Sequence, residues 1–251
     1  MNHDGQRPVL LAATRNPGKM HELLPLCGAA GFRLRSLDNA GITESPADED
    51  AIESFATFEE NALAKAHYFF TRSGGLPVLA DDSGLAVDAL QGAPGVHSKR
   101  WSGSAESGRV SGRSTDDANN ALLVRSLENH SERRARFVCA AALVWQEHGV
   151  THECVALGES RGVIIDSPRG THGFGYDPHF LSDELGITFA EAEREAKGVV
   201  SHRARAVRAV FAVYATRSLA DAARATRERR ESEPLTARGS VAKIPLRYRG
   251  A

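Results

Sequence analysis

Short apolar runs alternate along the chain with segments in which apolar residues recur at helical spacing. The first run, Val9–Ala13, predicts a buried strand, and Leu23 and Cys27 beyond it fall on one face of a predicted helix. Proline suits the first position of a helix, which favours a start at Pro17, whereas Pro25 predicts a kink or an early end. The chain therefore opens with a strand, a polar turn and a helix.

Later segments continue the alternation. Thr57-Phe58-Glu59-Glu60 has the form of a capping box and predicts a helix over residues 59–70. The apolar stretches Phe137–Trp145 and Thr151–Leu157 flank Glu147-His148-Gly149 and predict a hairpin. Further predicted elements are a helix over residues 116–128, a short strand over Arg161–Ile165, a helix after a second capping box at Thr188–Glu191, and a final helix capped by Ser201. With 251 residues, the chain has room for one large α/β domain or two small ones.

Composition sets the expected limits of that domain. Residues 1–7 are predicted to be a flexible N-terminus and residues 8–220 the folded domain. Residues 221–251 are rich in arginine and poor in core residues, which predicts a disordered tail or, alternatively, an arm that binds nucleic acid or a partner. Inside the domain, residues 38–54 and 102–114 are rich in turn-forming residues and predict surface loops, the second of them mobile.

Charge and cysteine content narrow the class of protein. The formal net charge is −1, which gives the whole chain no attraction to nucleic acid or to an anionic membrane. The first residues lack the apolar core of a signal peptide, and the run Phe137–Trp145 is too short to span a bilayer. The three cysteines show no Cys-x-x-Cys spacing, and Cys139 and Cys154 lie in apolar or alternating stretches that favour buried thiols. We therefore expect a cytoplasmic protein that binds neither nucleic acid nor membrane.

Two adjacent carboxylates give the strongest chemical signal. Val78–Ala80 reads as the end of a buried strand, which would deliver Asp81, Asp82 and Ser83 to a turn at Gly84. Because neighbouring side chains on a strand point to opposite faces, only one of the two Asp residues is expected to enter a given cleft, and the other to bond to backbone. Oxygen ligands without nearby Cys or His favour a hard cation such as Mg²⁺. The alternative is an ordinary polar turn.

The polar segment Thr14–Lys19 stands where the first predicted strand passes into a helix. A helix N-terminus offers amide groups and a positive dipole end to an anion, and Lys19 adds a charge suited to phosphate. The segment is not a Walker A loop, because the upstream glycine is missing and Met20 stands where Ser or Thr is required. It is either a phosphate-binding turn or an ordinary connection between a strand and a helix.

Three other places carry residues suited to a binding site. Asn61 and Lys65 lie one turn apart on the flank of a predicted helix, where they either share a cleft or face solvent. The segment Gly170–Phe180 alternates glycine with aromatics, which suits stacking on a flat ligand or a tight turn with core aromatics. His202 and Arg203 place cations at a helix N-terminus, against the helix dipole, which hints at a functional role.

Over roughly residues 8 to 217, motifs in this order resemble one family, the Ham1-type (RdgB/inosine triphosphatase-type) non-canonical purine nucleoside triphosphate pyrophosphatases. Each motif is modest alone, and the ordered set is specific. The motifs that carry the resemblance are Ala13-Thr14-Arg15-Asn16-Pro17-Gly18-Lys19, Thr57-Phe58-Glu59-Glu60-Asn61-Ala62-Leu63-Ala64-Lys65-Ala66, Ala80-Asp81-Asp82-Ser83-Gly84-Leu85, Gly92-Ala93-Pro94-Gly95-Val96, Gly173-Phe174-Gly175-Tyr176-Asp177-Pro178 and Ser201-His202-Arg203.

The resemblance implies an α/β fold with a mixed, twisted central sheet, flanking helices and two lobes around a central substrate cleft. It implies Mg²⁺-dependent hydrolysis of ITP, dITP and XTP to the monophosphate and pyrophosphate. The implied enzyme is a homodimer that clears deaminated purines from the nucleotide pool.

Residue by residue, the resemblance makes Asp82 the general base and a Mg²⁺ ligand, with Glu53 as the second metal ligand. The residues that it implies for substrate binding are Thr14, Arg15, Asn16, Pro17, Gly18, Lys19, Ser83, Phe174, Gly175, Tyr176, Asp177, Lys197, His202 and Arg203. Of these, the Thr14–Lys19 segment would hold the phosphates, and the residues from Phe174 onward would surround the base.

Two other functions remain open from the sequence. The segment Ile52-Glu53-Ser54-Phe55 has Phe55 where the family has glycine, which motivates a nucleotide-binding protein without turnover as one alternative. The other is a house-cleaning phosphatase of different base specificity, acting on modified pyrimidine or canonical triphosphates.

Overall fold

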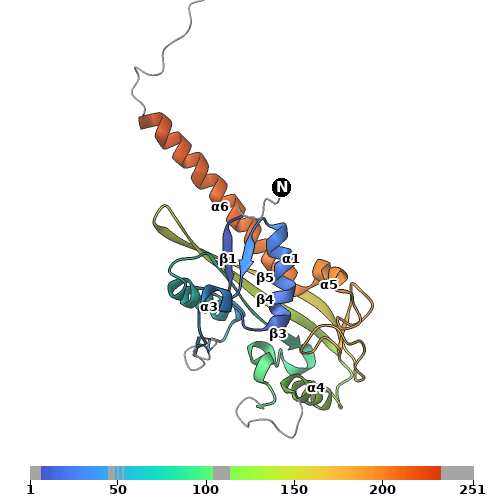
Figure 1. Ribbon diagram of the computed structural model, residues 1–251. Coiled ribbons are helices and arrows are strands. Elements are labelled where there is room, and N and C mark those ends of the chain that lie inside the picture. Colours follow the sequence, from blue (N-terminus) through green and yellow to red (C-terminus); the bar gives the residue numbers. More distant parts are fainter. Residues whose placement is uncertain (1–6, 45–48, 50, 53, 104–113, 233–251) are drawn as a thin grey trace, which may run out of the picture. The chain divides into compact units, whose positions relative to one another are not determined.

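A mixed sheet of six strands, in the order β2-β1-β3-β4-β5-β6, forms the centre of the protein (Figure 1). The computed structural model describes residues 7–44, 49, 51–52, 54–103 and 114–232, with side chains through residue 217. β1 runs parallel to β2 and β3, and the remaining neighbours are antiparallel. The strands are β1 (Val9–Ala12), β2 (Arg33–Arg35), β3 (Val78–Val87), β4 (Arg134–Glu147), β5 (Val150–Ile164) and β6 (Phe180–Ser182). The predicted mixed sheet is confirmed.

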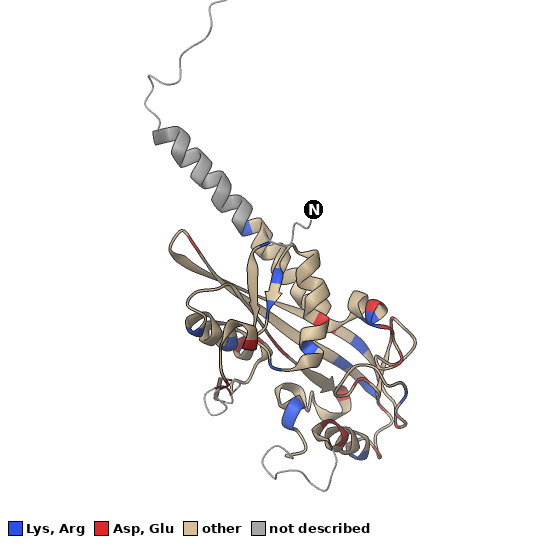
Figure 2. Ribbon diagram, in the orientation of Figure 1, with Lys and Arg blue, Asp and Glu red and all other residues tan. Residues whose placement is uncertain are grey.

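Helices flank this sheet, as predicted. The helices are α1 (Pro17–Ala29), α3 (Phe58–Arg72), α4 (Thr115–Ser126), α5 (Arg194–Val200) and α6 (His202–Ser232), with short 3₁₀ helices η2 (Asp38–Ala40), η3 (Asp88–Leu90) and η4 (Gly95–Arg100). Figure 1 shows α1 and α3 on either side of the strands β1 and β3. Residues of both charge signs are interspersed among these elements, and Figure 2 shows red and blue segments close together around β3.

β3 crosses the centre of the sheet without a break. The expectation that the strand ends at a glycine turn is wrong, because Asp81, Asp82 and Ser83 pair with β4 in an unbroken antiparallel ladder. Gly84 is needed for close approach instead: a Cβ there would lie 2.2 Å from the carbonyl oxygen of Gly95. The carboxylates therefore project from the middle of a rigid strand.

Two hydrophobic clusters lie along β3, one at each half of the strand. Val78 and Ala80 belong to the first cluster, which packs against α3. Leu85 and Val87 belong to the second, together with Leu123 of α4. Asp81, Asp82 and Ser83 lie along β3 between the residues of the two clusters, so the carboxylates stand at the boundary between the two cores. This division gives physical content to the predicted two lobes around a cleft.

α1 begins at Pro17, as predicted, but it does not end at Pro25. The helix continues to Ala29, held by the buried side chains of Leu23 and Cys27. Pro25 lies on the exposed face, where the carbonyl group that loses its partner can face water. The apolar stripe on the opposite face therefore outweighs the missing hydrogen bond.

The predicted hairpin is confirmed, and it is longer than expected. β4 and β5 pair from Glu147 and Val150 at the turn to Arg134 and Val163 at the far end. The turn residues His148 and Gly149 both have positive φ, 50° and 78°, as a tight hairpin turn requires. The separate strand predicted over Arg161–Ile165 is wrong, because those residues up to Ile164 belong to β5.

The predicted capping hydrogen bonds form, but the one at Thr188 does not begin a helix. Thr57 caps α3 by accepting the Glu60 N–H, and Ser201 accepts the Ala204 N–H at the start of α6. Thr188 and Glu191 make both reciprocal bonds of a capping box, at 2.8 and 3.1 Å, but the chain continues as a turn. The helix predicted there begins only at Arg194.

The chain divides into two compact units, Met1–Ala212 and Val213–Ala251. α6 continues through Ser232, so it overlaps the start of the predicted tail, and residues 233–251 lie outside the described part. The predicted limits at residues 7 and 220 stay predictions. Within the described residues, no helix is long and apolar enough to cross a membrane.

Candidate active site

A pocket of about 560 Å³ lies where the two cores meet and collects nearly all the predicted site residues. Its volume is that of a site for a small-molecule ligand. The predicted residues that line it are Thr14, Arg15, Asn16, Pro17, Lys19, Asp82, Ser83, Phe174, Gly175, Tyr176, Asp177, Lys197, His202 and Arg203. Gly18 lines a neighbouring groove. Glu53, the predicted second metal ligand, lies outside the described residues.

The turn before α1 is organised by its own side chains. Thr14 Oγ1 accepts the Asn16 N–H at 3.2 Å, and Asn16 Oδ1 accepts the Lys19 N–H at 3.1 Å. Pro17 has no N–H, and that of Met20 bonds to the Asn16 carbonyl. Among the described groups at this helix end, the Gly18 N–H is left for an anion.

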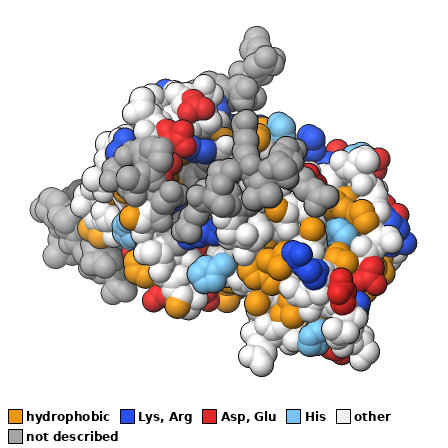
Figure 3. Space-filling view, turned by 90° about the horizontal axis from the view of Figure 1, so that it is seen from below, with side chains coloured by type: hydrophobic (Ala, Val, Ile, Leu, Met, Phe, Trp, Pro, Cys, Tyr) orange, Lys and Arg blue, Asp and Glu red, His pale blue; other side chains and the backbone are white. Residues whose placement is uncertain are grey.

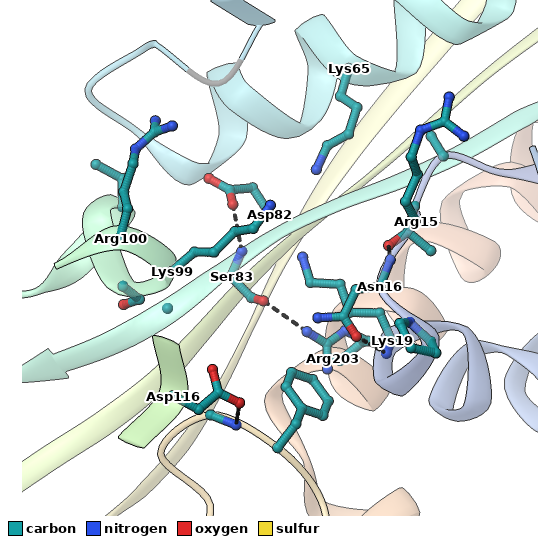
Figure 4. A pocket seen from close by; sticks show the side chains of 18 of the residues that line it. Arg15, Asn16, Lys19, Lys65, Asp82, Ser83, Lys99, Arg100, Asp116 and Arg203 are labelled. Atoms are coloured by element: carbon teal, nitrogen blue, oxygen red, sulfur yellow. Dashed lines mark hydrogen bonds between the residues drawn. The ribbon is translucent and has the colours of Figure 1, made fainter. Parts of the chain in front are cut away.

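Asp82 is held at both carboxylate oxygens. Its Oδ1 accepts the Ser83 N–H at 2.9 Å, and its Oδ2 accepts from Asn61 Nδ2 at 3.0 Å. Figure 4 shows Asp82 facing the pocket from β3, with Lys65 of α3 nearby. The side chain is buried but lines the cavity, so it is oriented by the protein and accessible to a ligand.

Asp81 points to the opposite face of β3, as strand alternation requires. The prediction that it bonds to backbone is wrong: its Oδ2 lies 3.1 Å from Lys19 Nζ and 3.0 Å from Arg203 Nε. Burial alone would raise the pKa of the Asp81 carboxyl, but Lys19 and Arg203 outweigh burial and hold that pKa below its ordinary value. Asp81 therefore fixes two cations beside the pocket.

A chain of ion pairs runs from Asp81 to the other end of the pocket through Glu22. Both carboxylate oxygens of Glu22 are engaged, one with Arg203 and the other with Lys197 Nζ at 2.8 Å. Lys197 Nζ also lies 2.6 Å from Asp177 Oδ2. Burial opposes ionisation of Glu22, but Arg203 and Lys197 lower its pKa to about 2. The chain alternates in sign throughout, so each charge in it lies beside an opposite charge.

Arg203 is the centre of this network and is only 1% exposed. Its Nε donates to Asp81, one terminal nitrogen donates to Glu22, and the other donates to Ser83 Oγ at 2.8 Å. Burial would lower the pKa of the guanidinium, but Asp81 and Glu22 raise it. Since each terminal nitrogen carries two hydrogens, one on each remains for a ligand.

Asp177 holds the aromatic turn together. Its Oδ2 accepts the Phe174 N–H at 2.9 Å, and a Cβ at Gly173 would lie 2.0 Å from the same oxygen. Burial raises the pKa of Asp177, although Lys197 and the Phe174 N–H oppose that rise. Burial would lower the pKa of Lys197, but the charges of Asp177 and Glu22 outweigh that effect and raise it. These contacts place the Phe174 ring at the pocket wall.

Two side chains of helix α4 bond to the backbone of the same turn. Asp116 Oδ2 accepts the Gly175 N–H at 2.8 Å, and Asn120 Nδ2 donates to the Gly175 carbonyl at 3.0 Å. The Tyr176 hydroxyl donates to the Ser98 carbonyl at 2.8 Å. Burial raises the pKa of Tyr176, so the hydroxyl stays protonated. Figure 4 shows Asp116 below the pocket, bonded to this turn.

His202 is buried at the inner end of the pocket. Its ring stacks on Phe137, with centroids 4.7 Å apart and planes at 11°. Burial, and then the positive charge of Arg203, lower the pKa of His202 well below its ordinary value, so the ring is neutral. Its Nδ1 has no hydrogen-bond partner among the described residues.

The Arg15 guanidinium forms an ion pair with another side chain. Its Nε and a terminal nitrogen donate to the two carboxylate oxygens of Glu49, at 2.8 and 2.7 Å. Glu49 raises the pKa of Arg15, against a smaller effect of burial. Figure 4 shows the Arg15 guanidinium directed away from Lys19. A phosphate role for this residue therefore depends on exchange of partners.

The solvent-facing alternative for Asn61 and Lys65 is wrong, because both side chains are buried and bond to β3, Asn61 to Asp82 and Lys65 to the Asp81 carbonyl at 2.9 Å. Lys65 lines the pocket, and Asn61 stands behind Asp82.

Glu22 and Asp116 belong to the site and were not predicted. Glu22 was missed, because a lone Glu three residues after Lys19 looks like a solvated helix position. Asp116 was missed for a similar reason: an acidic residue in the first turn of α4 is what any helix favours.

The fold and this pocket define an α/β protein with a buried ionic network beside a cavity that Asp82 lines. The chain matches the Ham1 family model over residues 10–213 and belongs to that family. A relative from Burkholderia pseudomallei named dITP/XTP pyrophosphatase is 46% identical over 81% of this chain and 92% of its own. One of the same name from Geobacter sulfurreducens is 46% identical over 79% and 92%.

Solved structures agree with this assignment. The Ham1 protein of Staphylococcus aureus superposes with a TM-score of 0.66 at 31% identity, covering 83% of this chain and 99% of its own. The nucleoside-triphosphatase (dITP/XTP pyrophosphatase) of Mycobacterium abscessus gives 0.56 at 39% identity, over 76% and 92%. The resemblance read from the motifs is confirmed.

Proposed function

We propose that this protein hydrolyses the non-canonical purine triphosphates ITP, dITP and XTP to the monophosphate and pyrophosphate. The single observation that carries the proposal is the position of Asp82, which faces one cleft between cationic side chains at one end and an aromatic turn with buried donors at the other. That is the arrangement a nucleoside triphosphate requires, and the curated relatives bear the corresponding name.

The phosphate end would be formed by α1, α3 and η4. The side chains of Lys19, Lys65, Lys99 and Arg100 line the pocket around Asp82. Figure 4 shows them entering the cavity from different sides. Cations on several sides of a triphosphate neutralise its charge and hold the α-phosphorus near Asp82.

The donor set fits Mg²⁺. Within the described residues, no group of three or more His, Cys, Asp or Glu side chains could hold a metal. The acidic side chains that line the pocket are Asp82, Glu44, Glu49, Asp116 and Asp177. A cation held by one or two carboxylates together with substrate phosphates and water is the usual situation of Mg²⁺. Asp82, with Glu53 as predicted, would hold it, and it would supply charge neutralisation on the phosphates.

Asp82 would act on the attacking water. Its carboxylate orients the water and accepts its proton, while the water oxygen forms a bond to the α-phosphorus. The bond from the α-phosphorus to the bridging oxygen breaks, and pyrophosphate leaves with that oxygen. Lys19 stabilises the charge that develops on the leaving group.

The base end would select the oxygen at C6. Neutral His202 and the remaining hydrogens of Arg203 offer donors to an acceptor, and adenine would place an amine against them. Phe174 would stack on the base. Guanine has the same oxygen, so its rejection has to come from crowding at its 2-amino group.

The proposal includes the finer expectations drawn from the family. We expect a cytoplasmic homodimer that depends on Mg²⁺, with the purine triphosphate as its partner and no binding of nucleic acid or membrane. Light scattering of the purified protein would check the homodimer, and replacement of Mg²⁺ by Ca²⁺ in the assay would check the dependence on Mg²⁺.

Hydrolysis of ITP in ¹⁸O-labelled water tests the reaction. Attack at the α-phosphorus puts the label into the monophosphate and leaves the pyrophosphate unlabelled. Label in inorganic phosphate would indicate a terminal phosphatase instead. Saturable ITP binding without any product would select the binding protein without turnover.

A further inference from the structure

We propose that Asn61 is the positioning residue for Asp82, an inference that rests on the catalytic role proposed for that carboxylate. Asn61 lies near the start of α3 and is only 1% exposed. Its Nδ2 donates to Asp82 Oδ2 at 3.0 Å. A hydrogen bond to one oxygen of a carboxylate restricts its rotation, and a general base has to lie within hydrogen-bond reach of the proton that it accepts.

The orientation of the Asn61 amide is fixed by the backbone of Phe55. Its Oδ1 accepts the Phe55 N–H at 2.9 Å, and its Nδ2 donates to the Phe55 carbonyl at 3.3 Å. Both hydrogens of Nδ2 are then used, one on Phe55 and one on Asp82. Rotating the amide by half a turn would set Oδ1 against the Asp82 carboxylate and Nδ2 against an N–H. Only one orientation is therefore compatible with the contacts.

The main chain beside Asp82 is held from the same helix. Lys65, one turn after Asn61, donates to the carbonyl of Asp81, which belongs to the peptide that precedes Asp82. The other carboxylate oxygen of Asp82 accepts the Ser83 N–H at 2.9 Å. α3 thus fixes both the backbone and the side chain of Asp82, and Asn61 supplies the contact that sets the plane of the carboxylate.

Two substitutions at Asn61 separate orientation from size. Asn61→Ala removes the donor and is expected to lower kcat by roughly tenfold to hundredfold, with a much smaller change in KM, because Asn61 bonds to Asp82 and does not itself line the pocket. Asn61→Asp keeps the acceptor for Phe55 but sets a second carboxylate against Oδ2. The two like charges repel, so the Asp82 carboxylate should turn from its position and kcat should fall at least as far as in Asn61→Ala.

The matched control is Thr57→Ala. Thr57 caps the same helix by accepting the Glu60 N–H at 3.2 Å and makes no contact with Asp82. This substitution should lower the melting temperature, since loss of an N-cap destabilises a helix, but leave kcat and KM as in the wild type. A merely structural role of Asn61 would make all three variants behave alike.

The experiment measures kcat, KM and melting temperature for the four proteins, with ITP as substrate and pyrophosphate release as the readout. Folded Asn61 variants with wild-type kcat would overturn the assignment. If Asn61→Ala does not fold, Asn61→Asp decides, because it keeps the size and the Phe55 contact. Wild-type protein that releases no pyrophosphate would refute the proposed reaction, which is a different failure.

Discussion

The two ends of the pocket are built on opposite principles. At the base end, Lys197 and Arg203 are buried and each lies between two carboxylates. At the phosphate end, Lys99 and Arg100 are exposed, and the Lys19 side chain is 16% exposed. The cations of the base end are therefore buried and paired, whereas the phosphate end adds two exposed cations, Lys99 and Arg100, to Lys19, which is paired with Asp81, and to the buried Lys65.

In the proposed function, this difference would assign specificity and binding to separate groups. The base end would discriminate through donors whose positions are fixed by ion pairs, so a wrong base would leave them unsatisfied. The phosphate end would attract any triphosphate, and its contribution would not depend on the base. Variants at one end should therefore change selectivity, and variants at the other should change rate or affinity for all substrates alike.

The largest expected effect is that of Asp82→Asn. Turnover of ITP should fall by about a thousandfold, because the amide cannot accept a proton from water, while ITP binding and the melting temperature stay close to those of the wild type. Single-turnover kinetics and calorimetric titration with ITP would measure this. Near-normal rates would remove Asp82 from the role of base.

Breaking the ion-pair chain should cost stability more than rate. Lys197→Met leaves Asp177 and Glu22 buried without their shared cation and should lower the free energy of unfolding by about 3 to 5 kcal/mol. Urea denaturation measures the loss. Lys99→Met at the phosphate end is the matched control and should leave stability unchanged, because Lys99 is exposed. Equal losses in the two variants would contradict the contrast between the ends.

Acid should weaken the fold in two windows. His202 has a pKa below its ordinary value of 6.5, so the unfolded chain binds a proton that the native state refuses, and stability falls as the pH drops below about 6.5. Glu22 has its pKa lowered from 4.5 to about 2, so its stabilisation is present above pH 4.5 and is lost as the pH falls toward 2. Melting curves across this range test both windows, and His202→Gln should abolish the upper one. A melting temperature that stays constant from pH 7 to pH 5 would contradict a neutral, buried His202.

The smallest expected effect is that of removing the hydrogen bond between Asp116 and the Gly175 N–H. Asp116→Ala removes the acceptor for the Gly175 N–H and should raise KM for ITP by about tenfold and narrow the preference for ITP over ATP. Asp117→Ala is the control, because Asp117 bonds to Ser114 at the same helix end and does not touch the aromatic turn. Identical kinetics in the two variants would show that α4 does not position the base pocket.

The sequence predicted the elements of the fold well where a single periodicity acts. The strand before Thr14, the hairpin around His148 and the helix after Thr57 all follow from local pattern and capping chemistry. It failed at Gly84, where glycine serves a close contact with Gly95 and not a turn. Such a contact involves another segment, so nothing local distinguishes it.

The candidate site was predictable where its residues stand in recognisable motifs and unpredictable where they act through space. Asp82, Lys19 and Arg203 come from motifs, and the structure brings them to one pocket. Glu22 belongs to the site through its ion pairs with Lys197 and Arg203, which are far away along the chain, so no local pattern marks it. Thr188 shows the converse, because a complete capping box forms there without a helix.

The most direct test of the division between the two ends is the specificity constant, kcat/KM, for ITP, XTP, ATP and GTP, measured in parallel by pyrophosphate release. The account predicts efficient release from ITP and XTP and little from ATP or GTP, with similar affinity for the triphosphate group in all four. Equal specificity constants for ITP and ATP would contradict a base end built to select the C6 oxygen.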